Sequence, residues 1–88
     1  MRLRLDKFLK VSRLIRRRTL AKDVADQGRV AVNGKKAKAG TKVSVGDEIA
    51  IQFGQKLVTV QVLSLSEVVK KGDAKTLYKV LKEERVNS

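Results

Sequence analysis

Residues 18–34 read RTLAKDVADQGRVAVNG, and the hydrophobic period changes within this stretch. Before Gly28 the apolar side chains recur with the 3.6-residue period of a helix, at Leu20, Ala21, Val24 and Ala25. After Gly28, Val30 and Val32 alternate with other residues, as in a strand with one buried face. Glycine readily adopts the left-handed conformation that ends helices. The stretch therefore predicts a helix followed directly by a strand.

Downstream, turn signals separate several short alternating segments. Asn33-Gly34 is typical of a type I′ hairpin turn, which needs positive φ at both central residues, and it predicts a short return strand over 35–39. Residues 48–53 and 56–62 alternate again, and Gly54-Gln55 between them favours a Gly-first type II′ hairpin. These segments predict a small, mostly antiparallel sheet.

Upstream, residues 4–15 carry a second helical stripe of apolar side chains, which includes Leu5, Phe8, Leu9 and Ile15. Asp6 lies in the first turn of this predicted helix, where a carboxylate suits the helix dipole. Thr19 is expected to cap the following helix.

The last quarter of the chain is less regular. Residues 63–69 can continue a strand, residues 70–73 form a polar break, and the spacing of Leu77, Tyr78, Val80 and Leu81 predicts a short C-terminal helix. The expected fold class is α+β: two N-terminal helices, then the sheet, then that helix. We assign residues 1–62 to one domain and 63–88 to an extension packed on it.

The composition of this 88-residue chain excludes several kinds of site. Without His or Cys, a structural zinc site, a His-dependent active site and a disulfide framework are excluded. The longest apolar runs are far shorter than the ~20 residues of a membrane span, so we expect a soluble cytoplasmic protein without a membrane partner. A chain this short has little room for a catalytic pocket beside its core, and we expect no enzyme and no cofactor.

Positive charge is concentrated in the first half of the chain. Residues 1–44 carry 14 basic and 3 acidic side chains, a net charge of +11, whereas residues 45–88 carry 7 and 6, a net charge of +1. Solubility alone requires no such asymmetry. A strongly cationic half attracts a polyanion, because bound phosphates release condensed counterions. We interpret this half as a nucleic-acid-binding surface.

The arginine run at 16–18 lies between the two predicted helices, and arginine pairs bidentately with phosphate. A solvated charge run is the alternative reading. With one tyrosine and two phenylalanines, base stacking is not expected to be the main means of binding. Asp6 is expected to cap its helix or to orient a neighbouring arginine. The candidate RNA-binding residues are Arg4, Lys7, Lys10, Arg13, Arg16, Arg17, Arg18, Lys22, Asn33, Lys35, Lys36 and Lys38.

Four motifs together resemble the S-four RNA-binding domain, a family shared by pseudouridine synthases, some aminoacyl-tRNA synthetases and ribosome-associated factors. They are RLDKFL at 4–9, the series Arg18, Ala21, Val24 and Ala25, the pattern GxVxVNG at 28–34, and VGDEI at 45–49. Arg17 stands where that family usually has serine. The resemblance implies an S-four-like fold that binds structured RNA.

No catalytic domain follows the matched segment, so the chain resembles the stand-alone members of the family. The segments 5–15, 17–22, 25–29 and 53–62 are similar to small ribosome-associated members that act in ribosome quality control. That resemblance implies binding to large ribosomal subunits obstructed by peptidyl-tRNA, with contacts to rRNA and tRNA. It also implies support for C-terminal alanine tailing by a partner that recruits tRNA. We expect a monomer. The alternatives are a general structured-RNA or ribosome-assembly binding protein and a DNA-binding regulator.

Overall fold

The computed structural model describes residues 2–65 and 77–85, and within them two helices and seven strands form an α+β fold, as expected. The helices are α1 (Leu5–Val11) and α2 (Arg18–Asp26). The strands are β1 (Leu3–Arg4), β2 (Val30–Val32), β3 (Lys35–Lys36), β4 (Lys42–Val43), β5 (Glu48–Phe53), β6 (Lys56–Val62) and β7 (Tyr78–Arg85).

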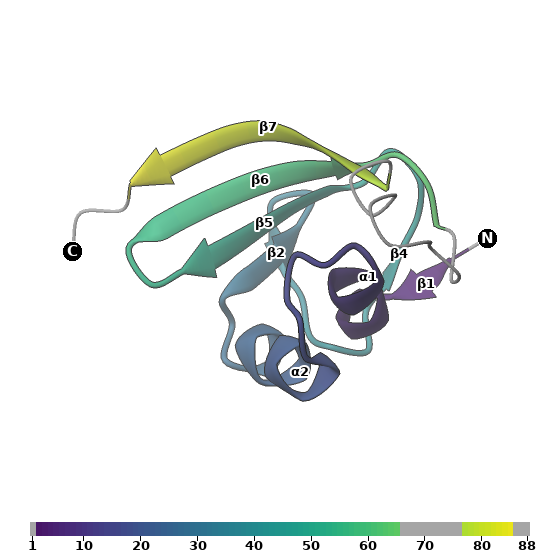
Figure 1. Cartoon of the computed structure of the whole chain (residues 1–88), viewed down its shortest axis with the longest axis horizontal. Coiled ribbons are helices and arrows are strands. Elements are labelled where there is room, and N and C mark those ends of the chain that lie inside the picture. Colours follow the sequence, from purple (N-terminus) through teal and green to yellow (C-terminus); the bar gives the residue numbers. More distant parts are fainter. Residues whose placement is uncertain (1, 66–76, 86–88) are drawn as a thin grey trace.

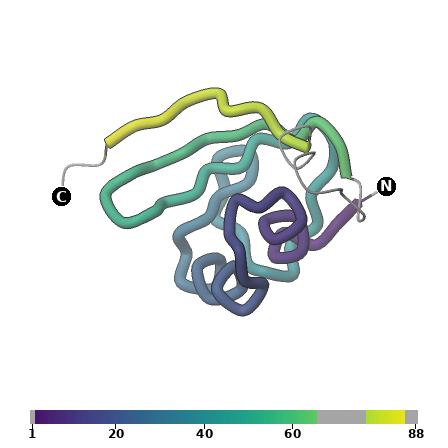
Figure 2. Tube along the Cα trace, viewed as in Figure 1, coloured from purple at the N-terminus to yellow at the C-terminus, as the bar shows by residue number. Residues whose placement is uncertain are grey.

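All strand pairs in the described residues are antiparallel. The main sheet has the order β3-β2-β5-β6-β7, and a separate pair joins β1 to β4. Both helices lie on the same side of the main sheet (Figure 1). The Cα trace shows the turn between β5 and β6 extending beyond both helices (Figure 2). The helices therefore cover only part of this face of the sheet.

One hydrophobic core fills the space between the helices and the sheet. From α1, Leu5, Phe8 and Leu9 are fully buried, and from the sheet Ile49 and Val60 are fully buried. Ala21 and Ala25 of α2 are also buried, and their small side chains let α2 pack closely. Most of the apolar positions expected from the two helical stripes form this core, but Leu20 is exposed and Val24 is only partly buried.

The turns expected from the sequence are confirmed. Gly28 follows α2 with φ +76°, in the left-handed region. Asn33 and Gly34 both have positive φ, and Val32 pairs with Lys35 across them, as a type I′ turn requires. Gly54 has φ +57° between β5 and β6.

The prediction that the first helix runs over 4–15 is wrong, because α1 ends at Val11. Arg13 has φ +61°, and the backbone N–H of Ile15 donates to the carbonyl of Leu9 at 3.0 Å. This tight turn folds Ile15 back into the core, where its side chain is 4% exposed. The apolar spacing is correct, but a turn places Ile15 instead of a continued helix.

The expected cap of the second helix is also wrong. The helix begins at Arg18, so Thr19 lies inside it, and the N-cap residue is Arg17, which makes no side-chain capping hydrogen bond. The Arg18 side chain instead bonds to Asp6, as described below. A long-range contact, and not a local cap, anchors the start of α2.

The predicted C-terminal helix is a strand. β7 pairs with β6 from Lys56↔Arg85 to Val62↔Tyr78. Pairing satisfies the backbone groups on the outer edge of β6, which a helix would leave unpaired. Leu81 is the extra residue where the register shifts at Thr59/Val60.

Three smaller expectations about strands and domains have mixed outcomes. The return strand expected over 35–39 is only β3, and residues 63–65 belong to no strand. Residues 66–69, the rest of the segment predicted to continue a strand, and the polar break at 70–73 lie outside the described residues. The boundary between 1–62 and 63–88 stays a prediction. In the described part of the chain, no helix is long and apolar enough to cross a membrane.

Burial predicts different costs for two valine truncations. Val60 is fully buried and Val45 is 61% exposed. We expect Val60→Ala to lower the free energy of unfolding by about 2 kcal/mol, because two buried methyl groups are lost and a cavity remains. Val45→Ala should change it by less than about 0.5 kcal/mol. Urea denaturation of both variants checks this, and equal costs would contradict the assigned core.

Candidate nucleic-acid interface

A buried carboxylate organises two arginines at the start of the helices. The Asp6 side chain is 3% exposed, whereas the side chains of Arg4 and Arg18 are 44% and 47% exposed. The Asp6 carboxylate accepts from Arg4 Nε at 3.2 Å and from Arg18 Nε at 3.4 Å. It also accepts from the backbone N–H of Lys7 at 2.9 Å. Asp6 thus orients two arginines, one of its two expected roles; it lies inside α1, whose N-cap residue is Arg4.

The strand pair β1–β4 holds Arg4 in this position. Arg4 pairs with Lys42, and the next backbone N–H groups, of Leu5 and Asp6, donate to the carbonyls of Thr41 and Ala39 at 2.7 and 3.2 Å. The chain around Arg4 is therefore fixed on one side by backbone hydrogen bonds and on the other by Asp6. Both guanidinium groups can still bind a further anion, because about half of each arginine side chain stays in solvent.

The turn between the helices presents three more arginines. Arg13, Arg16 and Arg17 are exposed, and no carboxylate pairs with them in residues 2–65 and 77–85. Arg13 occupies the left-handed region, which is costly for a residue with a Cβ atom and is often found at functional sites. These cations are available to a bound anion.

Two of the predicted lysines, Lys36 and Lys38, lie near the other end of α2. The aliphatic chain of Lys36 passes Gly28, since a Cβ atom there would lie 3.8 Å from its Cδ. The Ala39 N–H donates to the Asp26 carboxylate at 3.3 Å, which ties the segment after β3 to the same end of the helix. α2 has nine residues, which at about 1.5 Å each span roughly 13 Å. Arginines and lysines thus flank opposite ends of one short helix.

The remaining predicted residues differ in their surroundings. Lys10 and Lys22 are exposed on α1 and α2, and Lys38 is exposed in the loop after β3. Lys7 is half-buried. Asn33 is exposed, but its side-chain oxygen accepts from Glu48 N–H at 2.9 Å and its amide donates to Asp47 at 3.2 Å. Asn33 therefore has a structural task in the hairpin, and its contact with RNA stays a prediction.

Two described cations of the C-terminal half, Lys56 and Lys82, are paired with acidic neighbours. Lys56 lies 3.5 Å from Glu83, and Lys82 lies 2.7 Å from Glu84. The hydrogen bond and the charge of Glu84 raise the pKa of Lys82. The outer strands therefore add little to the positive field, in contrast to the arginine-rich turn.

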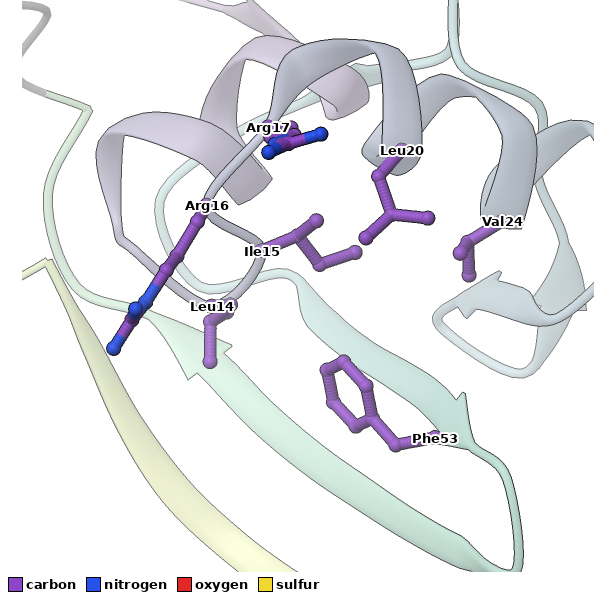
Figure 3. A pocket seen from close by; sticks show the side chains of 7 residues that line it. All are labelled: Leu14, Ile15, Arg16, Arg17, Leu20, Val24 and Phe53. Carbon is purple, nitrogen blue, oxygen red and sulfur yellow. The ribbon is translucent and has the colours of Figure 1, made fainter.

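An apolar hollow that the sequence pattern does not indicate lies beside the arginines. Phe53, at the end of β5, faces Leu14, Ile15, Leu20 and Val24 across a space of about 360 Å³ (Figure 3). Arg16 and Arg17 also line this hollow. Phe53 is 37% exposed and Leu20 is 51% exposed, so the hollow opens to solvent. Alternation along β5 indicates the correct face for Phe53 but not that the helical cover has ended there.

The arrangement can bind anions. No cluster of three His, Cys, Asp or Glu residues that could bind a metal ion occurs in the ranges 2–65 and 77–85. Asp6, the most deeply buried carboxylate of these ranges, is engaged by two guanidinium groups. The observed features are fixed positive groups at a protein surface.

Comparisons with known proteins agree with this arrangement. A model of the S4 domain family matches residues 3–49. The chain is 64% identical over 85 residues to the RQC P-site tRNA stabilizing factor of Halalkalibacterium halodurans, covering 97% of both chains. It is 62% identical over 84 residues to the protein of that name from Bacillus subtilis, covering 96% of this chain and 98% of that one. The trimeric structure of heat shock protein 15 from Vibrio cholerae superimposes with a TM-score of 0.83 at 30% identity, covering 91% of this chain and 82% of that one.

Replacing Asp6 by asparagine has two opposite effects on RNA binding, one through the lost negative charge and one through the lost orientation of Arg4 and Arg18. Asp6→Asn removes a negative charge, so a purely electrostatic surface would bind RNA more tightly. We expect weaker binding, because Arg4 and Arg18 lose the carboxylate that orients them. The free energy of unfolding should fall by about 1.5–3 kcal/mol, the usual range for hydrogen bonds to a charged group. Filter binding and thermal unfolding measure the two effects.

The matched control is Asp23→Asn, which makes the same chemical change at an exposed position of α2. This variant should keep wild-type stability and bind RNA as well as, or slightly better than, wild type. Weaker RNA binding by Asp23→Asn than by Asp6→Asn would show that orientation by Asp6 does not matter.

Proposed function

Because the chain belongs to the S4 domain family and, within it, to the RQC P-site tRNA stabilizing factors, we propose that it binds large ribosomal subunits obstructed by peptidyl-tRNA. It contacts rRNA and tRNA there and acts in ribosome quality control. The observation that carries the proposal is the pair of arginines held by Asp6 on a cationic surface. Near full-length similarity to the stabilizing factors supports the ribosomal target.

The proposed contact surface consists of α1, the turn after it, α2 and the β2–β3 hairpin. Arg4, Arg16, Arg17 and Arg18 bind phosphates, and the lysines and Arg13 widen the positive surface. Arginines oriented by a buried carboxylate distinguish this surface from a mobile basic tail, since their positions suit a particular arrangement of phosphates. Such a surface recognises folded RNA by its shape and backbone.

A bridging mode of binding explains how so small a protein selects one ribosomal state. A surface of about 1,000 Å², the size of a single nucleic-acid-binding module, gives limited preference for one RNA. When rRNA and peptidyl-tRNA lie side by side, the second contact becomes intramolecular and raises the affinity by ~10² or more. The protein then prefers subunits that still hold a tRNA.

The wider role follows from the family resemblance. By stabilising the tRNA, the protein supports addition of a C-terminal alanine tail by a partner that recruits tRNA. It acts in the cytoplasm as a monomeric, non-enzymatic factor. A general structured-RNA or ribosome-assembly role is the second candidate, because the cationic surface alone fits it equally well. A DNA-binding regulator is less well supported, since the two short helices and a hairpin do not resemble a dimeric major-groove reader.

Phosphate binding predicts a steep salt dependence. With six or more phosphates contacted, affinity for structured RNA should fall by about 10³ between 50 and 200 mM salt. Duplex DNA should bind more weakly at each salt concentration. Fluorescence anisotropy with a hairpin RNA and a DNA duplex of equal length measures both. A flat salt response, or a preference for the DNA, would refute the RNA surface.

Bridging predicts selective co-sedimentation with obstructed subunits. We expect the protein in the peak of large subunits that carry peptidyl-tRNA, at well above its level with empty large subunits or translating ribosomes. Gradient fractionation of reconstituted particles, with immunodetection of the protein in each peak, measures this. Equal occupancy of empty and obstructed subunits would reject bridging and favour the general RNA-binding role.

Two arginine variants serve as a matched pair in the same fractionation. Arg16→Ala should reduce binding to obstructed subunits, and Arg85→Ala, at the end of β7, should leave it unchanged. Both residues are exposed and both changes remove one positive charge. Similar losses would mean that total charge matters and that the position of the surface is wrong.

A further inference from the structure

The hollow lined by Phe53 combines an apolar floor with cations at its edge. Leu14, Leu20 and Val24 supply aliphatic surface opposite the Phe53 ring, and Ile15 closes the bottom toward the core (Figure 3). A space of about 360 Å³ falls in the range of small-ligand pockets. Phe53 and Leu20 nevertheless stay well exposed. The protein thus maintains an open apolar recess that its own core does not fill.

The edge of the recess has the charge of a phosphate-binding site. Arg16 and Arg17 line it, and neither pairs with a carboxylate in the part of the chain that the structure describes. Arg18, the next residue, is held by Asp6 at 3.4 Å. Arg18 therefore directly follows two residues of the recess edge, and one bound RNA can reach both the recess and Arg18.

We propose that this recess binds the base of an unpaired nucleotide in the recognised RNA, with the flanking phosphates on Arg16 and Arg17. The inference rests on the proposed function, because it specifies how the same surface contacts RNA. An unpaired nucleotide joins one flat apolar face to two neighbouring phosphates, and the recess joins one apolar floor to two arginines. The open mouth leaves the polar edges of the base in water.

The apolar lining predicts stacking without base selectivity. Leu20, Val24 and Phe53 offer no hydrogen-bond partner for the edge of a base, so any base has a comparable fit. An apolar side chain of a protein partner is the competing occupant. The net charge of +11 on residues 1–44 favours a polyanion over a peptide, which brings fewer and less regularly spaced charges.

A pair of RNA hairpins of equal charge tests the recess. One carries a single bulged adenosine and the other an abasic residue at the same position, so the phosphates are identical and only the base differs. The full chain should bind the adenosine bulge about tenfold more tightly than the abasic one. Phe53→Leu, which keeps an apolar side chain but removes the ring, should reduce this ratio to below about threefold and leave affinity for the abasic hairpin unchanged.

Further variants and a direct readout separate the possible results. Leu20→Ala should also lower the ratio, whereas Leu81→Ala, an exposed leucine on β7, should not. Methyl NMR signals of Leu20 and Val24 should shift with the adenosine bulge and not with the abasic one. If the wild-type protein binds the two hairpins equally tightly, or if Phe53→Leu leaves the ratio of the two affinities unchanged, the base site is wrong. The proposed function still stands in that case, provided that both hairpins bind tightly and in a salt-sensitive way. Binding of both hairpins no tighter than duplex DNA overturns both.

Discussion

The buried carboxylate of Asp6 is the constraint on which the N-terminal half depends. A charge removed from water must be paired, and the Asp6 side chain is only 3% exposed. Arg4, just before α1, and Arg18, at the start of α2, pair with this carboxylate. The same bonds set α2 against α1 and leave both guanidinium groups half in solvent. The bonds of Asp6 with Arg4 and Arg18 thus both hold the two helices together and keep the arginines at the surface.

Features determined by neighbours in the sequence could be predicted. The left-handed Gly28, the Asn33-Gly34 turn and the change of period between them depend on backbone geometry within a few residues. The charge asymmetry and the role of Asp6 were likewise accessible, because a carboxylate among basic residues has few other partners. The site residues other than Asn33 follow from positive charge and position in the chain. Asn33 follows only from its place in the predicted turn, and its side chain is bonded within the hairpin.

Features determined by distant residues were missed for a common physical reason. Leu77, Tyr78, Val80 and Leu81 have the spacing of a helix, but the free edge of β6 gains more from a paired strand. Ile15 reaches the core through a turn because Arg13 adopts positive φ. Phe53 follows the buried pattern of β5 and yet lies where the helices no longer cover the sheet. In each case contacts with distant residues determine the local structure or the burial, and the spacing of apolar residues along the chain does not contain those contacts.

A newly made chain leaves the ribosome N-terminus first, so Leu3 emerges long before its partner Val43. Until β4 has been made, Arg4 lacks the strand that holds it beside Asp6. The order of synthesis therefore sets the order of these contacts: the bond between Asp6 and Arg18 lies within the first 18 residues, whereas the backbone pairing that fixes Arg4 needs residues 42 and 43.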